Sequence, residues 1–169
     1  MSAVPHAALQ LLRWIWALPA TAVGLAAAGC ALCFGARPRI VEGVVEIGGG
    51  RLARWTRALP SVLRFEAITL GHIVIGCSDT ALARLRDHER VHVRQYERWG
   101  LFFFPAYLGS SLWQLLRGRH PYFDNRFEVE AFRTAAAAPA RPRCEHHGVT
   151  REHAHTNAHA YSSASDLAQ

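Results

Sequence analysis

Two histidines and a glutamate have the spacing that zinc-dependent hydrolysis requires. The chain reads His88-Glu89-Arg90-Val91-His92. Residues four apart on a helix share a face, with Cβ atoms about 5–6 Å apart, so both imidazoles can reach one Zn²⁺ at about 2.0–2.1 Å. Glu89 adjoins the first histidine, where a carboxylate can take a proton from a water whose pKa zinc lowers towards about 7. We therefore predict that His88 and His92 bind zinc and that Glu89 is the general base and acid.

A long helix is predicted to hold this motif. Ser78, Asp79 and Thr80 supply N-cap chemistry, and a helical pattern continues to Trp99, where Gly100 stops it. The alternative interpretation is a solvated helix face on which two histidines fall by coincidence. A preceding strand, a later acidic helix and an apolar stretch between the two helices favour a metal site.

The later helix is predicted from Arg126 to Ala138, with Asp124 or Asn125 as its N-cap. Its sequence from Glu128 onward, Glu-Val-Glu-Ala-Phe, resembles the gluzincin group of zinc peptidases, particularly the membrane-bound prenyl-protein and heat-shock-type members. In that group a Glu-x-x-Ala-Asp segment on a downstream helix supplies the third ligand as its first Glu. The resemblance carries this role onto Glu128.

The chain departs from the gluzincin pattern at Phe132, where the family has an aspartate that supports a metal-bound histidine. Glu130 is the competing carboxylate on this helix, but it points about 200° away from Glu128. Glu128 borders the apolar positions, and Glu130 falls on the polar side. Only Glu128 therefore has the surroundings that a buried ligand needs.

A closer resemblance covers about Phe65 to Phe132, through HERVHVRQYERWGLFFFPAYL and NRFEVEA. It is to a small group of uncharacterised bacterial membrane proteins. This resemblance implies an architecture and a bacterial membrane, but no substrate.

Composition favours a lipid partner over nucleic acid. The chain has 169 residues, half of them apolar, and all 19 basic residues are arginine, with a net charge of +6. No nucleic-acid motif or aromatic platform accompanies the arginines, so we predict no nucleic-acid partner. Cys30 and Cys33 lie in an apolar run, and Cys77 and Cys144 stand apart in the sequence. The cysteines therefore predict neither a disulfide framework nor a zinc ribbon.

The N-terminal segment from Trp14 to Phe34 contains 21 uncharged residues. As a helix it would be about 31 Å long, which matches the hydrocarbon core of a bilayer. A cleaved signal sequence ending near Cys30 is the alternative, but the apolar run continues past that residue. More arginines follow the segment than precede it, so the positive-inside rule places the following domain in the cytoplasm.

The predicted fold class is α+β: an N-terminal transmembrane helix, a small β-sheet and a metallopeptidase-like set of helices. Arg39 to Ile47 is predicted as a strand, and Phe65 to Gly76 as a long strand or a hairpin that turns at Gly71-His72. Arg51 to Leu59 is predicted as a short helix. The predicted domains are a membrane anchor (1–38), an HExxH domain (39–138) and a disordered His-rich tail (139–169).

Two further features leave alternatives open. Leu101 to Leu116 is apolar but only 16 residues long, which favours a core helix or an interfacial helix over a membrane span. On the motif helix, arginines recur at Arg86, Arg90, Arg94 and Arg98. This stripe predicts either a solvated face or contact with anionic lipid headgroups.

The predicted function is a membrane-anchored zinc-dependent hydrolase of the bacterial inner membrane that cleaves a peptide or protein substrate. The alternative is a non-catalytic membrane protein with a structural or degenerate metal site. Gln95 is assigned to packing and His72 to a half-buried strand position. Four side chains are candidates for stabilising an oxyanion: Tyr96, Tyr107, His120 and Tyr122.

Overall fold

A four-stranded sheet, in the order β1-β2-β4-β3, is central to the part of the chain that the computed structural model describes, residues 6–60 and 64–138. Two antiparallel hairpins build it: β1 (Arg37–Val41) with β2 (Val44–Gly48), and β3 (Ala67–Leu70) with β4 (Ile73–Gly76). The hairpins join through parallel pairing of β2 with β4, in which Val45 lies opposite Ile73. β1 and β3 are the two edges of the sheet.

The prediction of one strand over Arg39 to Ile47 is wrong, because the chain reverses at Glu42-Gly43. Both residues have positive φ, 50° and 77°, the conformation that two-residue hairpin turns require. The uninterrupted β-branched pattern on either side concealed this turn. The predicted alternative of a hairpin at Gly71-His72 is confirmed, and Gly71 has a φ of 63°.

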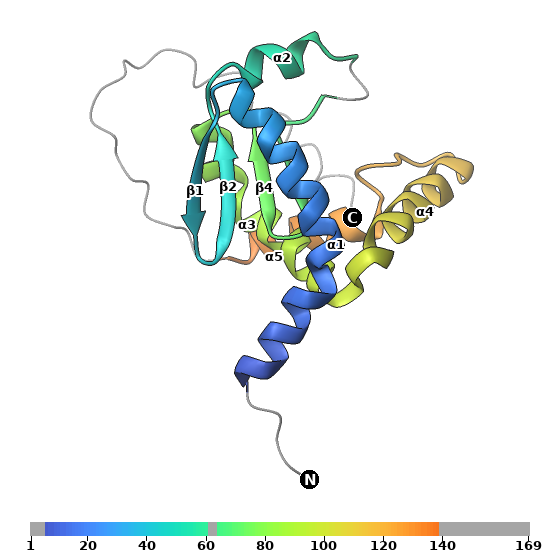
Figure 1. Ribbon diagram of the computed structural model, residues 1–169. Helices are drawn as coiled ribbons and strands as arrows, with labels where there is room; N and C mark the ends of the chain where they lie inside the picture. Colours follow the sequence, from blue (N-terminus) through green and yellow to red (C-terminus); the bar gives the residue numbers. More distant parts are fainter. Residues whose placement is uncertain (1–5, 61–63, 139–169) are drawn as a thin grey trace. The chain divides into compact units, whose positions relative to one another are not determined.

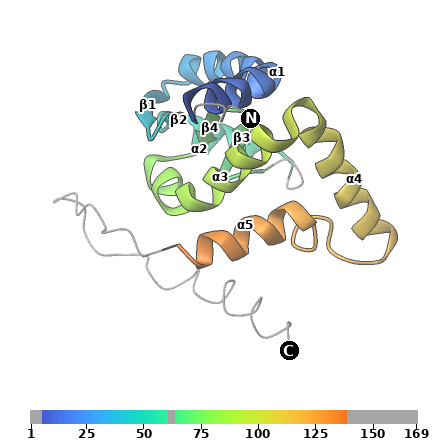
Figure 2. The ribbon, with the colours of Figure 1, turned by 90° about the horizontal axis from the view of Figure 1, so that it is seen from below.

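Helices α1 (His6–Cys33) and α3 (Asp79–Trp99) cover opposite faces of the sheet (Figure 1). Alternation along β4 directs Ile73 and Ile75 towards α1, where they pack with Ala28 and Ala31. Val74 points the other way, in a cluster with side chains of α3. Figure 2 shows α1, the sheet, α3 and α5 (Arg126–Ala136) as successive layers.

The caps of the motif helix and of α5 follow the sequence-based predictions. The Ser78 hydroxyl accepts a hydrogen bond from the backbone N–H of Ala81, and α3 ends at Gly100, whose φ is 55°. Of the two candidate caps for α5, the structure has Asn125, whose side chain accepts from the N–H of Phe127. The predicted short helix is α2 (Leu52–Ala58).

The apolar stretch after α3 is not a core helix. It forms a 3-10 turn, η2 (Gly100–Phe102), and then α4 (Phe103–Leu116). Within α4, which is described throughout, Phe103 is the buried residue, and large apolar side chains such as Leu112 and Leu116 are exposed. The core-helix interpretation of Leu101 to Leu116 is therefore wrong.

The described chain is a mixed α/β fold with a small sheet and an apolar N-terminal helix. The described residues pack as one unit, so α1 is a layer of the domain that contains the motif. The predicted tail, 139–169, lies outside the described residues.

Candidate metal centre

Three potential metal ligands from two helices meet in the interior. His88 and His92 lie on α3, and Glu128 lies on α5. The Nε2 atoms of the two histidines are 3.1 Å apart, and the Glu128 carboxylate lies 3.2 Å from His88 Nε2 and 3.5 Å from His92 Nε2. All three side chains are buried, and their ligand atoms lie within 4.8 Å of one another. The structure thus brings together the three residues proposed as ligands.

Glu128 is fixed by contacts between α4 and α5. Asn125, fully buried, caps α5 and donates from Nδ2 to the carbonyl of Tyr107 and to the hydroxyl of Ser111. The Tyr107 hydroxyl donates to Glu128 Oε1 over 2.7 Å. The otherwise apolar α4 therefore contributes an anchor that sets the position of the α5 carboxylate.

Gln95 orients His92, a role that the packing assignment from sequence missed. Its Nε2 donates to the carbonyl of Phe127 at 3.1 Å and to the carboxylate of Glu130 at 3.0 Å. The amide oxygen therefore faces His92 Nδ1, 2.8 Å away, and the imidazole must donate that bond. His92 Nδ1 thus carries the proton, and its Nε2 is left for a metal.

Phe132 lies against His88, with ring centroids 4.7 Å apart and planes inclined by 50°. This is the side chain that stands where the gluzincin pattern has an aspartate. The position does face a histidine of the site, but it offers an aromatic ring in place of a carboxylate. Tyr122 and Phe123 extend the ring cluster around Phe132.

Glu89 is buried beside the edge strand β3. Its Oε2 accepts a hydrogen bond of 2.7 Å from the Thr69 hydroxyl. Thr69 points to the α3 side of the sheet because its neighbours in β3 alternate to the other side. Glu89 is near enough to the site for its charge to contribute to the raised pKa of His92. The strand thus holds the carboxylate next to the ligand cluster.

Coupled charges stabilise the cluster. Burial alone would lower the pKa of His92, but the hydrogen bond and charge of Glu128 raise it above its ordinary value. Burial likewise acts to raise the pKa of Glu128, yet the two neighbouring histidines and the hydrogen bond from Tyr107 hold that pKa well below its usual range. The anionic carboxylate thus attracts positive charge at this point, which a proton or a metal cation can supply.

The donor set fits a metal ion such as zinc. The Oε2 atom of Glu128 is buried and accepts no hydrogen bond from the described residues, although it lies 3.2 Å from His88 Nε2. Such a buried oxygen is costly unless a cation compensates for its lost solvation. Two imidazole nitrogens and a carboxylate oxygen are ordinary zinc ligands, and three protein ligands leave a position for water.

The oxyanion candidates are dispersed. Tyr107 reaches the site but bonds to Glu128, and Tyr96 lies in the core, where burial raises its pKa to about 12. The His120 ring nitrogen accepts from two backbone N–H groups in the turn before α5. His72 lies between α1 and α3, where its ring contacts Thr21 and Glu97.

The arginines of the stripe lie in two different environments. Arg86 makes two hydrogen bonds, of 2.8 and 2.9 Å, to the buried carboxylate of Glu46, and the hydrogen bond raises the pKa of Arg86. Arg90 is buried, contacts Glu46 at 3.5 Å and donates to the carbonyl of Val41. The prediction of a stripe facing solvent or headgroups throughout is therefore wrong for Arg86 and Arg90. Arg94 is exposed.

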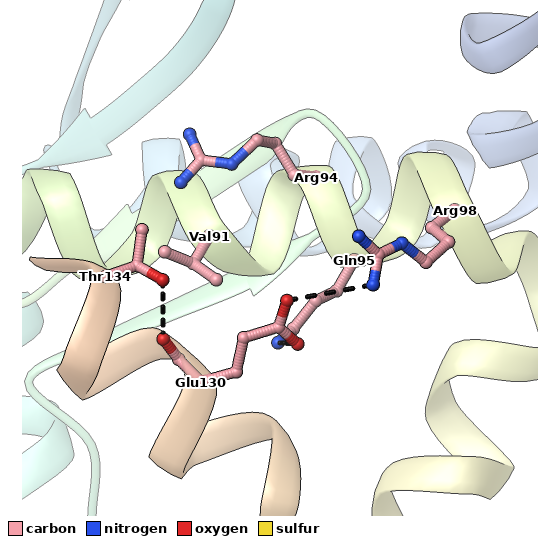
Figure 3. Close-up of a pocket in the computed structure, with 6 residues that line it drawn as sticks. All are labelled: Val91, Arg94, Gln95, Arg98, Glu130 and Thr134. Atoms are coloured by element: carbon pink, nitrogen blue, oxygen red, sulfur yellow. Dashed lines mark hydrogen bonds and ion pairs between the residues drawn. The ribbon is translucent and has the colours of Figure 1, made fainter.

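Gln95, which bonds to His92, also lines a groove between α3 and α5 (Figure 3). Glu130 lies in this groove between Gln95 and Arg98, whose guanidinium is 3.8 Å away. Glu130 is thus directed away from the ligand cluster, and only Glu128 of the two α5 carboxylates faces the histidines.

Comparisons with families of known proteins, with curated proteins and with solved structures find no match.

Proposed function

We propose that this protein is a membrane-associated zinc-dependent hydrolase that cleaves peptide bonds. The observation that carries the proposal is the buried cluster of His88, His92 and Glu128, with the carboxylate of Glu89 one residue from the first ligand. Two neutral nitrogens and one anionic oxygen leave a bound Zn²⁺ with net positive charge, which suits Lewis-acid catalysis.

A bound zinc ion would supply an activated water and polarise the scissile carbonyl. Glu89 would accept the proton from that water and pass it to the leaving amine. Thr69, on the edge strand, holds this carboxylate in place by its 2.7 Å hydrogen bond. Gln95 and Tyr107 fix His92 and Glu128, so their role is to position the ligands.

Membrane association rests on α1. One helix among the described residues, Ala8–Cys33, is 26 residues long and apolar enough to cross a membrane by length and composition. We propose the bacterial inner membrane as the location, with the metal centre on its cytoplasmic side, where anionic lipid headgroups would attract the arginines that follow the apolar segment. A peptide or protein at that membrane is the proposed substrate.

A non-catalytic metal protein is the second candidate, and Phe132 is the observation that favours it. The ring packs on His88 where a carboxylate would raise the basicity of that ligand. A site without this support still binds metal through three protein ligands, and its purpose would then be structural.

Zinc content and turnover of a Glu89→Gln variant separate the two candidates. The purified full chain in detergent should contain one zinc per molecule and cleave members of a quenched-fluorescent peptide library. Glu89→Gln should keep the zinc and lose at least 100-fold in rate, on the scale of general acid–base catalysis. Glu66→Gln is the matched control, because this exposed carboxylate pairs with Arg84 on the surface.

Equal cleavage by Glu89→Gln and the unmodified protein would exclude the proposed mechanism. Zinc-loaded protein without any cleavage of the library would favour the structural role. A chain that binds no zinc would contradict both candidates.

A further inference from the structure

One face of α1 is occupied by the domain along most of its apolar length. Ala17 is fully buried, Thr21 contacts His72, and Ala31 packs with the sheet. Gly24 lies so close to β3 and β4 that an added Cβ would be 2.5 Å from the carbonyl oxygen of Leu70. From Ala17 to Ala31 the helix rises about 21 Å. This helix is therefore joined to the sheet and cannot be positioned independently of it.

The outward face of α1 carries large apolar side chains. Small residues occupy the packed face, so the bulky residues project from the molecule. More than half of the surface of each of these side chains is exposed: Leu11, Leu12, Ile15, Leu18, Val23 and Leu25. An apolar surface of this extent marks a contact with lipid or protein.

A charged hairpin runs beside the same segment. β1 begins at Arg37, just after α1 ends (Figure 1). The β1–β2 turn lies level with Trp14, since a Cβ on Gly43 would be 3.9 Å from the Trp14 ring. The Arg39 and Glu42 side chains on this hairpin are 54% and 57% exposed. If α1 crossed the bilayer, these charges would lie at the depth of the hydrocarbon. Charged side chains are costly at that depth of a bilayer.

The edge of the sheet adds a second objection to a spanning α1. β1 pairs with β2 on one side, and its other side is an edge in the sheet order. Unpaired backbone groups at a lipid-exposed sheet edge have no hydrogen-bond partners in hydrocarbon. The hairpin therefore belongs in water along its whole length.

A second apolar surface adjoins that of α1. Trp16 on α1 and Phe102 on η2 have ring centroids 6.3 Å apart, and they connect α1 to the exposed apolar residues of α4. At the far end of α4 the Arg117 guanidinium lies 5.1 Å from the Trp113 ring centroid. Tryptophan and arginine are typical of the boundary between lipid and water.

We propose that α1 lies in the plane of the bilayer, with its outward face and that of α4 inserted into one leaflet. The protein is then monotopic: both ends of α1 and the whole domain are on the same side of the membrane. This arrangement covers the apolar residues of both helices and keeps Arg39, Glu42 and the sheet edge in water. It does not depend on the proposed catalytic function.

Thiol labelling in membrane vesicles tests this arrangement. In a full-length chain whose four native cysteines are replaced by serine, single cysteines are introduced by Gln10→Cys, Arg37→Cys and Leu25→Cys. Gln10 lies near the start of α1, Arg37 lies just beyond its end, and Leu25 is an exposed residue of α1 between them. Right-side-out and inverted vesicles are treated with a membrane-impermeant maleimide. Arg94→Cys, at an exposed position of α3, reports the side on which the domain lies.

The proposal expects the cysteines at 10, 37 and 94 to react from the same side, and the cysteine at 25 to react only after detergent is added. Reaction of positions 10 and 37 from opposite sides would overturn the proposal and establish a membrane span. Reaction of position 25 without detergent would show that the outward face is in water. Disulfide-linked dimers of Leu25→Cys on mild oxidation would show that a second copy covers it, which also contradicts the proposal.

Discussion

Glu128 and Glu130 stand two residues apart on α5 and lie in different environments. Glu128 is buried against both histidines, whereas the Glu130 side chain is 43% exposed and bonds to Gln95. Glu128→Gln should weaken zinc affinity by about 10-fold or more, because the change removes the anionic ligand. Glu130→Gln, the matched control, should change it far less. Competition with a chromogenic chelator measures both affinities. Loss of zinc from Glu130→Gln alone would show that Glu130, and not Glu128, is the ligand.

Gln95 is the residue whose importance only the structure reveals. Gln95→Leu removes the acceptor for His92 Nδ1 and should lower zinc affinity by about 10- to 100-fold. Gln95→Glu combined with Glu130→Gln keeps an acceptor oxygen for His92 without setting two carboxylates against each other, and should retain more of the affinity. The visible spectrum of the Co²⁺-substituted protein reports the ligand geometry directly. Arg94→Ala is the control, and an equal loss in that variant would indicate a general effect on α3.

At the scale of residues, the sequence allows the ligand spacing to be predicted but not the supporting contacts. His88 and His92 follow from helix periodicity, and Glu128 from the resemblance combined with the apolar positions of its helix. Gln95 could not be assigned, because its partners Phe127 and Glu130 lie on another helix. A hydrogen bond between elements depends on their packing, which the sequence pattern of one helix does not contain.

At the scale of elements, Glu46 connects the β1–β2 hairpin to α3. Its buried carboxylate contacts Arg86 at 2.8 Å and Arg90 at 3.5 Å. Glu46→Ala should reduce the free energy of unfolding by about 3–5 kcal/mol, because removing one partner leaves buried charge without compensation. Arg94→Ala, an exposed change on the same helix, should stay within about 0.5 kcal/mol. Urea unfolding followed by circular dichroism compares the two variants, and equal effects would contradict the role of Glu46 in joining the hairpin to α3.

The elements themselves were predictable where local signals were strong. Ser78 and Gly100 define the ends of α3 by cap chemistry, and Asn125 begins α5. The turn at Glu42-Gly43 was missed because a two-residue reversal hardly interrupts an alternating β-branched pattern. The arginine stripe was misinterpreted for a related reason: helical periodicity identifies a shared face but not the buried Glu46 that this face meets.

At the scale of the whole molecule, the apolar N-terminal segment has two tasks. Its small residues form a packing surface for the sheet, and its large residues form an exposed apolar face. The length and hydropathy of the segment predict its exposed apolar face, but they do not predict its packing surface for the sheet. The same α1 also approaches α3, where Ala17 packs with Tyr96. The apolar helix α1 is thus part of the layered structure that holds the candidate metal centre.

The metal centre should not require the residues after Ala138. The proposed ligands and the side chains that position them lie between Thr69 and Phe132, and α5 ends at Ala136. A chain truncated after Ala138 should therefore bind one zinc with unchanged affinity and unfold at the same temperature. Metal analysis and a thermal melt in detergent measure this against the full chain. The histidines beyond residue 138 can bind metal only weakly if the prediction holds, so extra zinc in the full chain should be removed by a mild chelator. Loss of the tightly bound zinc on truncation would instead show that a histidine of the tail is a ligand.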